Sequence, residues 1–224
     1  MPRLELDRKL ADLREQVLLM GQDVEAAISA SMAALTHNNR TAAAAVIAGD
    51  DMIDCRCAQI GDTCAHLITL QQPAIRDLRV VLASLAISED LERIGDHAEG
   101  IAQLVCRLPT PPDGQTMLAL NGIAALARVQ LKDALDAYRT GDATRARAVW
   151  ASDADVDRLH GRLVQSLIAS MGKDPDELAT DTYLLWLAHN LERIADRAGN
   201  ICERVVFIAT GERRLAMAPV AAAS

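Results

Sequence analysis

Hydrophobic residues recur three and four positions apart along most of the chain, the spacing that places them on one face of an α-helix. Breaks in this pattern divide the chain into six long helical segments. The first two are expected at about 4–36 and 41–70, with the turn His37-Asn38-Asn39 between them. The third follows Gln72-Pro73 and reaches about residue 107, because proline suits the first turn of a helix.

The second half of the chain has the same organisation. The Pro-rich stretch around residues 109–114 cannot continue a helix, so we expect it to link two halves. A fourth helix is expected at about 115–139, and a fifth runs from the turn Gly141-Asp142 to near Gly172. Residues 174–177 (DPDE) are typical of a helix start, and the sixth helix that they open reaches about residue 211.

Two stretches of the first half recur in the second. Residues 91–105 and 191–205 share eight of fifteen aligned residues, beginning with LERIGD and LERIAD. Upstream, the pattern DxxID at 50–54 aligns with DxxVD at 153–157. These correspondences indicate an internal repeat of three helices. We therefore predict an all-α fold of two tandem, pseudo-symmetric three-helix bundles. Residues 1–108 and 115–213 form the bundles, 109–114 the linker and 214–224 a flexible tail.

Composition and charge narrow the class of protein. Hydrophobic residues make up 50% of the chain but aromatic residues only 2%, which favours a core of close-packed aliphatic helices. A net charge of −8 argues against a nucleic-acid partner, which would need a basic surface. No run approaches the ~18 apolar residues of a membrane span, and the start of the chain has no secretory signal. The five cysteines include no CxxC pair, which indicates reduced thiols and a cytoplasmic location.

Pairs of acidic residues four positions apart occur at equivalent places in both repeats. A single pair usually lies on a solvated surface, where its repulsion costs ~0.2–0.5 kcal/mol. The occurrence of four such pairs at equivalent places in two repeats is a stronger indication of a functional site. Helical geometry places each pair away from the apolar stripe, and adjacent antiparallel helices can bring two pairs together. The pairs are Asp50/Asp54 and Glu92/Asp96 in the first repeat, and Asp153/Asp157 and Glu192/Asp196 in the second.

Four converging carboxylates would either take up protons or hold a cation. An oxygen-rich site suits Mg²⁺, Mn²⁺ or Fe²⁺, and Zn²⁺ also binds carboxylates together with histidine. His189 lies on the acidic face and Asn200 follows one turn after Asp196, so both are further candidates as ligands. Gly100 stands where the second repeat has Asn200, so the first site either lacks this ligand or uses the neighbouring Glu99.

Motifs of known catalytic classes are absent from the sequence, so no catalytic residue is assigned. It contains no phosphate-binding loop, dinucleotide fingerprint, HExxH or GxSxG motif, and no Glu-x-x-His pair of the di-iron enzymes. A metal-binding regulator that acts through protein contacts is therefore favoured over an enzyme. The alternatives are a carboxylate-metal hydrolase or oxidase, and a helical scaffold without metal.

At these residues the sequence resembles the PhoU family of phosphate-signalling proteins, whose two repeats each carry an E(D)xxxD pair and an LERIGDH-like helix. Residues 71–79 (QQPAIRDLR) are similar to the family's entry into its third helix, and Asp96-His97 and residues 196–203 complete the match. The resemblance implies tandem three-helix bundles, usually dimeric. It also implies multinuclear iron or zinc sites, or magnesium or manganese, on the acidic faces.

The same resemblance implies a role as accessory protein and negative regulator of phosphate uptake. Its expected partners are the ATPase subunit of the phosphate ABC transporter and a membrane-bound phosphate sensor histidine kinase. Association with the membrane would then come only through these partners. The expected outcome of the regulation is that phosphate-starvation genes stay off when phosphate is ample.

Overall fold

The structure is a computed structural model that describes residues 2–152, 154–172 and 177–212. Within these ranges every regular element is a helix, which confirms the predicted all-α fold. None of the described helices is both long enough and apolar enough to cross a membrane. The first repeat consists of α1 (Pro2–Thr36), α2 (Arg40–Gln71) and α3 (Ile75–Arg107).

In the second repeat, the segment expected as one fifth helix consists of two consecutive helices. The break follows Ser152, whose backbone N–H and hydroxyl both donate to the carbonyl of Val149, at 3.0 and 2.7 Å. Such local bonding by a serine side chain competes with the helical hydrogen-bond pattern. The predicted start signal at 174–176 and the predicted tail lie outside the described residues. The helices are α4 (Gly114–Thr140), α5 (Ala143–Ala151), α6 (Ala154–Met171) and α7 (Leu178–Thr210).

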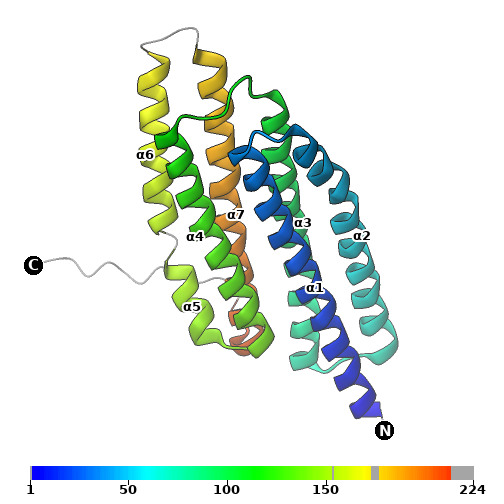
Figure 1. Cartoon of the computed structure of the whole chain (residues 1–224). Coiled ribbons are helices and arrows are strands. Elements are labelled where there is room, and N and C mark those ends of the chain that lie inside the picture. The colour runs from blue at the N-terminus through cyan, green and yellow to red at the C-terminus, as the bar shows by residue number, and fades with distance from the viewer. Residues whose placement is uncertain (1, 153, 173–176, 213–224) are drawn as a thin grey trace, which may run out of the picture.

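The two repeats lie side by side, with α3 and α7 at the centre and α2 and α6 on opposite flanks (Figure 1). Helix α3 contacts α1, α2 and α7, and α7 contacts α3 and the three other helices of its own repeat. Helices α1 and α4 also pack against each other. The buried aliphatic residues of all these helices form one continuous core, so the repeats are joined by packing as well as by the chain.

Tyr138 of α4 is a buried contact between the repeats. Its side chain is fully buried, and its hydroxyl shares a 2.6 Å hydrogen bond with Ser84 of α3. The guanidinium of Arg14 on α1 lies over the tyrosine ring, 5.6 Å from the centroid. One aromatic residue of the second repeat thus contacts two helices of the first.

The turn between the first two helices is built in the same way in both repeats. A residue with positive φ, Asn38 at 46° and Gly141 at 69°, ends the first helix. The next residue, Asn39 or Asp142, donates its N–H to a carbonyl five positions back and caps the following helix with its side chain. Asn39 therefore corresponds to Asp142, an offset of 103 positions that holds for both flanking helices.

Candidate metal centres

Acidic residues from two helices converge in the first repeat. Helices α2 and α3 are antiparallel neighbours joined by a short turn, and carboxylate oxygens of Asp50, Asp54 and Asp96 lie within 4.8 Å of one another. Asp50 is half-buried, whereas Asp54 and Asp96 are exposed, so ions from solvent can reach the group. Three of the four acids predicted for this repeat therefore come together in one place.

Two further carboxylates, Glu92 and Glu99, lie close enough to repel this group. Burial, followed by repulsion from the four other acids, raises the pKa of Asp50 to about 6. Burial is also the main cause of the raised pKa values of Glu92 and Asp96, followed by repulsion from neighbouring carboxylates. The raised pKa values show that ionisation of Asp50, Glu92 and Asp96 is disfavoured, and either protons or a bound cation would relieve the repulsion.

The protein itself supplies little positive charge to this cluster. Among the described residues, no lysine, arginine or histidine forms an ion pair with Asp50, Asp54 or Asp96. Glu99, the alternative ligand expected from the sequence, accepts a 2.8 Å hydrogen bond from Gln103. Arg93 and His97 lie near enough to offset part of the negative charge on Glu92 and Asp96, but neither forms an ion pair there. The acid cluster, defined as Asp50, Asp54, Glu92, Asp96 and Glu99, therefore offers oxygen ligands that no ion pair occupies in the part of the chain that the structure describes.

Gly95 allows α3 to approach α2 at the acid cluster. A Cβ atom at this position would lie 3.1 Å from Asp50 Oδ1 and 3.1 Å from a methyl carbon of Ile53. Such distances are tighter than ordinary van der Waals contact, so the backbone of α3 runs directly beside the Asp50 carboxylate. The second repeat has Ala195 at the equivalent position.

The acids of the second repeat differ from those of the first in their exposure and their partners. Asp153 lies outside the described residues, and Asp157 is exposed on α6. Glu192 and Asp196 are half-buried on α7, but Asp196 accepts a 2.7 Å hydrogen bond from the guanidinium of Arg193. One predicted ligand of this repeat is therefore already neutralised by an ion pair within its own helix.

Histidines are part of the surroundings of Glu192. Burial raises the pKa of Glu192, Asp196 raises it further, and His160, Arg193 and His189 oppose the shift. His189 Nδ1 lies 3.6 Å from Glu192 Oε2, as expected for a residue on the acidic face. His160 was not a candidate in the sequence analysis. Its position three residues after Asp157 on the same helix was the available signal.

Asn200, the other candidate ligand, takes part in a contact between the repeats. Its side-chain amide donates to Asp90 Oδ1 at 3.2 Å, and Arg197 lies 3.3 Å from the same oxygen. Asp90 is only 7% exposed, and its pKa is raised by burial despite these partners. The sequence analysis missed Asp90, although it directly precedes the repeated LERI segment.

The α3–α7 interface, called the seam below, has an equivalent of the Asp90–Arg197 contact on its opposite side, formed by other residues. Asn190 corresponds to Asp90, and its Oδ1 lies 3.0 Å from His97 Nδ1. A Cβ atom at Gly100, the counterpart of Asn200, would lie 3.3 Å from the same Asn190 oxygen. The repeats therefore meet about a pseudo-two-fold axis, with a charged contact on one side and a neutral contact on the other.

The fold and these clusters define a class of all-helical proteins in which two equivalent bundles each present acidic residues on their last two helices. A family model described as the PhoU domain matches residues 17–105 and again 120–205. Together these spans cover most of the chain, and the chain belongs to the PhoU family. The family resemblance seen in the sequence is thereby confirmed.

Individual relatives match nearly the whole chain. The phosphate-specific transport system accessory protein PhoU homolog of Caulobacter vibrioides is 38% identical over 213 residues, covering 94% of this chain and 92% of the relative. The homolog of Clostridium acetobutylicum is 33% identical, with coverages of 95% and 98%. The crystal structure of the phosphate transport system regulatory protein PhoU from Streptococcus pneumoniae superposes with a TM-score of 0.88 at 32% identity, covering 94% of this chain and 100% of that one.

Proposed function

We propose that this chain is an accessory protein of a phosphate transport system and a negative regulator of phosphate uptake and of phosphate-starvation genes. The observation that carries the proposal is the match of 94% of the chain to a relative of that name, together with a PhoU domain in each half. The protein acts in the cytoplasm as a homodimer and is not an enzyme. Its partners are the ATPase subunit of the phosphate ABC transporter and the phosphate sensor histidine kinase.

The fold supports a role exerted through protein contacts. Two bundles of long helices present extended surfaces, and the net charge of −8 disfavours direct contact with nucleic acid. Regulation would then pass from the transporter to the kinase through these surfaces. In this scheme the chain couples two other proteins and supplies no chemical step of its own.

A deletion strain tests the regulatory proposal. Without this gene, a reporter for phosphate-starvation genes should be expressed in phosphate-rich medium, and the wild-type gene on a plasmid should restore repression. The tagged protein should co-purify with a transporter or kinase component from cells grown in high phosphate. Normal repression in the deletion strain, together with the absence of both components from the purified sample, would show that the proposal is wrong.

We further propose that the acidic faces bind divalent metal ions, one ion or a small cluster in each repeat. The convergence of Asp50, Asp54 and Asp96 supports this for the first repeat, where an all-oxygen donor set suits Mg²⁺, Mn²⁺ or Fe²⁺. In the second repeat, the histidines around Glu192 make Zn²⁺ or iron the better match. A bound ion would stabilise the fold, because it binds the folded state and has no preformed site in the unfolded chain.

Elemental analysis of protein purified without chelator tests this metal proposal. The protein should contain a divalent ion, and chelation followed by dialysis should lower its melting temperature. A chain that carries no metal and does not respond to added Mg²⁺, Mn²⁺ or Zn²⁺ would instead be a metal-free scaffold. Assays with phosphate esters and with peroxide address the enzyme alternative, and sustained turnover in either would favour it.

A further inference from the structure

An apolar groove lies on the surface of the first repeat, between α1 and α2. It has a volume of about 470 Å³, and Gly95 of α3 lies at its floor. Met52 is 59% exposed at its edge, and a flexible thioether side chain adapts readily to a partner. Most of the walls are small side chains: Ala26, Ala27 and Ala30 on α1, and Ala42, Ala45 and Gly49 on α2.

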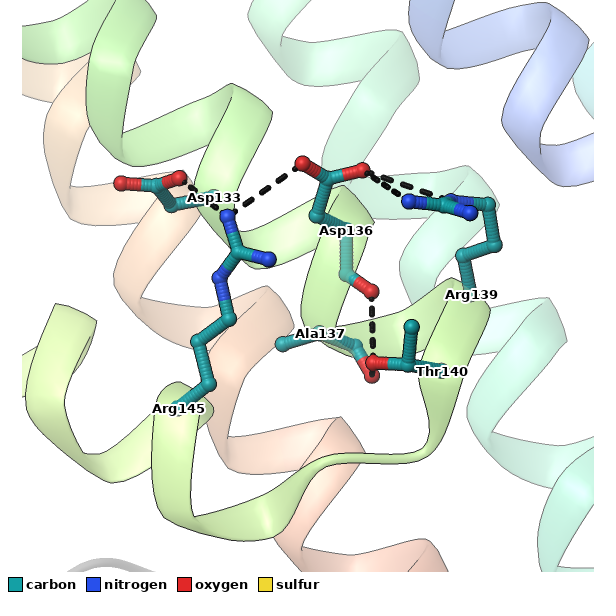
Figure 2. A network of polar contacts seen from close by, with 6 residues as sticks. All are labelled: Asp133, Asp136, Ala137, Arg139, Thr140 and Arg145. Carbon is teal, nitrogen blue, oxygen red and sulfur yellow. Dashed lines mark hydrogen bonds and ion pairs between the residues drawn. The ribbon is translucent and has the colours of Figure 1, made fainter.

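Part of the corresponding surface of the second repeat carries a polar network. With the offset of 103 positions set by the turns, Ala30, Ala33 and Ala42 correspond to Asp133, Asp136 and Arg145. Figure 2 shows the Arg145 guanidinium of α5 between the two carboxylates of α4, 2.6 Å from Asp133 and 3.3 Å from Asp136.

Arg139 adds a further contact to Asp136, at 2.9 Å. The second repeat thus satisfies this surface with its own side chains. The first repeat has alanine at the positions of Asp133, Asp136 and Arg145, and two of these alanines, Ala30 and Ala42, line the open groove.

The length of the groove fits a helix. From Ala42 to Ile53 it follows α2 for about 16 Å, or three helical turns. A helix with apolar residues at i, i+3 or i+4, and i+7 presents a row of that length. Because the walls are mostly methyl groups, the backbone of such a helix could come close, and its larger side chains would fill the space between α1 and α2.

Charge determines which kind of helix fits. Asp50 lines the groove and belongs to the acid cluster, so one end of the groove opens onto five carboxylates. A divalent ion would neutralise only part of that charge. Asp23, on the facing wall, is already paired with Arg56 at 2.6 Å. A second copy of this chain, with its net charge of −8, is a poorer electrostatic match than a basic partner.

We propose that this groove is a docking site for an amphipathic helix of another protein, with an apolar row of three turns and lysine or arginine residues at one end. The apolar row packs between α1 and α2, and the basic end lies over the acid cluster. In the described part of the second repeat, Arg145 and its two aspartates occupy the surface that corresponds to Ala30 and Ala42, which closes that end of the counterpart of the groove. The proposal does not depend on the identity of the metal or on the regulatory output.

A synthetic peptide provides the probe. It is a fluorescein-labelled helix of about 14 residues, with leucines at i, i+3, i+7 and i+10 and three arginines at one end. A matched peptide carries glutamates in place of the arginines. Fluorescence anisotropy with the full chain should show binding of the basic peptide at least about tenfold tighter than binding of the acidic one. Equal affinities would overturn the electrostatic part of the proposal.

Two double variants of equal net charge locate the binding. Ala30→Asp/Ala42→Arg transfers the polar pair of the second repeat into the groove and should weaken binding of the basic peptide by about tenfold or more. Ala44→Arg/Ala48→Asp adds the same residue types to exposed positions of α2 outside the groove, and should change affinity by less than about twofold. Circular dichroism and melting temperature confirm that both variants fold.

Two results would overturn the proposal. Equal binding by wild type and Ala30→Asp/Ala42→Arg would place the peptide elsewhere on the chain. If instead the peptide fails to bind, and sedimentation shows a wild-type dimer that this variant loses, the groove is a contact between copies of this chain.

Discussion

The two repeats share one helical plan but treat their polar residues in opposite ways. In the first repeat, five carboxylates repel one another around Asp50, and the adjacent groove is lined mainly by small apolar residues. In the second, Arg193 binds Asp196, and Arg145 joins two aspartates across a turn. The comparison teaches that two repeats can share their buried packing and still differ at the surface, where Arg145 and Arg193 pair with acids of the second repeat and the acid cluster of the first has no ion pair with any residue that the structure describes.

The largest expected effect is on metal binding, and it should differ between the repeats. Asp54→Ala/Asp96→Ala removes two converging oxygens and should weaken Mn²⁺ binding by at least about tenfold, with unchanged helical content. Glu192→Ala/Asp196→Ala should have a smaller effect, because Asp196 is already paired with Arg193. Calorimetric titration and elemental analysis measure both.

The control for this prediction is Asp51→Ala/Asp62→Ala, which removes the same charge from exposed positions of α2 outside the acid cluster. It should leave metal content and affinity close to wild type. An equal loss in this control would mean that Mn²⁺ responds to net charge alone. A larger loss from the second-repeat variant would reverse the comparison between the two sites.

The seam between α3 and α7 should respond unequally on its two sides. Arg197→Ala removes the ion-pair partner of buried Asp90, leaves Arg204 as its nearby positive charge, and should lower the free energy of unfolding by about 2 kcal/mol. His97→Ala removes a neutral hydrogen bond to Asn190 and should cost about 1 kcal/mol. Urea denaturation measures both values. Adding Asp90→Asn to Arg197→Ala should recover part of the loss, and equal losses from the two single variants would contradict the assignment.

The polar network of the second repeat should contribute a smaller amount. Arg145→Ala should lower the melting temperature only slightly, since its side chain is 39% exposed and solvent screens the pairs. Arg158→Ala, which breaks a single exposed pair with Asp155, should cost less than about 0.5 kcal/mol. High salt should reduce the difference in stability loss between Arg145→Ala and Arg158→Ala, because it screens exposed ion pairs. A neutral result for Arg145→Ala in thermal denaturation would show that the network fills space without stabilising the fold.

The smallest effect concerns pH, measured on metal-free protein. The folded-state pKa of Asp50, about 6, lies above the usual value of 3.8, so the folded state binds more protons between these values. Its contribution to stability therefore decreases as pH rises through this window. Asp50→Asn should raise the melting temperature more at pH 7 than at pH 5, when compared with wild type at the same pH. A larger gain at pH 5 than at pH 7 would contradict this prediction.

Much of the fold could be predicted from the sequence, because the signals are local. The three-and-four spacing of apolar residues predicts the helices, and the repeated LERI segments predict the two bundles. The acids of α2 and α3 also meet as expected, since an i, i+4 pair on each of two antiparallel helices with a short connection leaves few other arrangements. Asp50, Asp54 and Asp96 follow from that reasoning.

Other features could not be predicted, because they depend on how the two bundles pack against each other or on the hydrogen bonds of individual side chains. The bonds from Asp90 to Arg197 and Asn200 require the register between α3 and α7, which no spacing within either helix reveals. The groove arises only when the alanines of α1 face those of α2. The end of α5 at Ser152 depends on a serine hydroxyl that bonds locally, whereas Gly49 at the equivalent place lies within the uninterrupted α2.

The pseudo-two-fold seam has an evolutionary consequence. If a single repeat paired with an identical copy, each substitution would appear on both sides of the axis, and a charged contact could not coexist with a neutral one at the same position. Covalent linkage removes that constraint, because Asp90 and Asn190 are encoded separately. One mutation can then weaken or strengthen the contact on a single side of the axis. The packing between the bundles can therefore change on one side at a time, which is impossible for two identical paired copies.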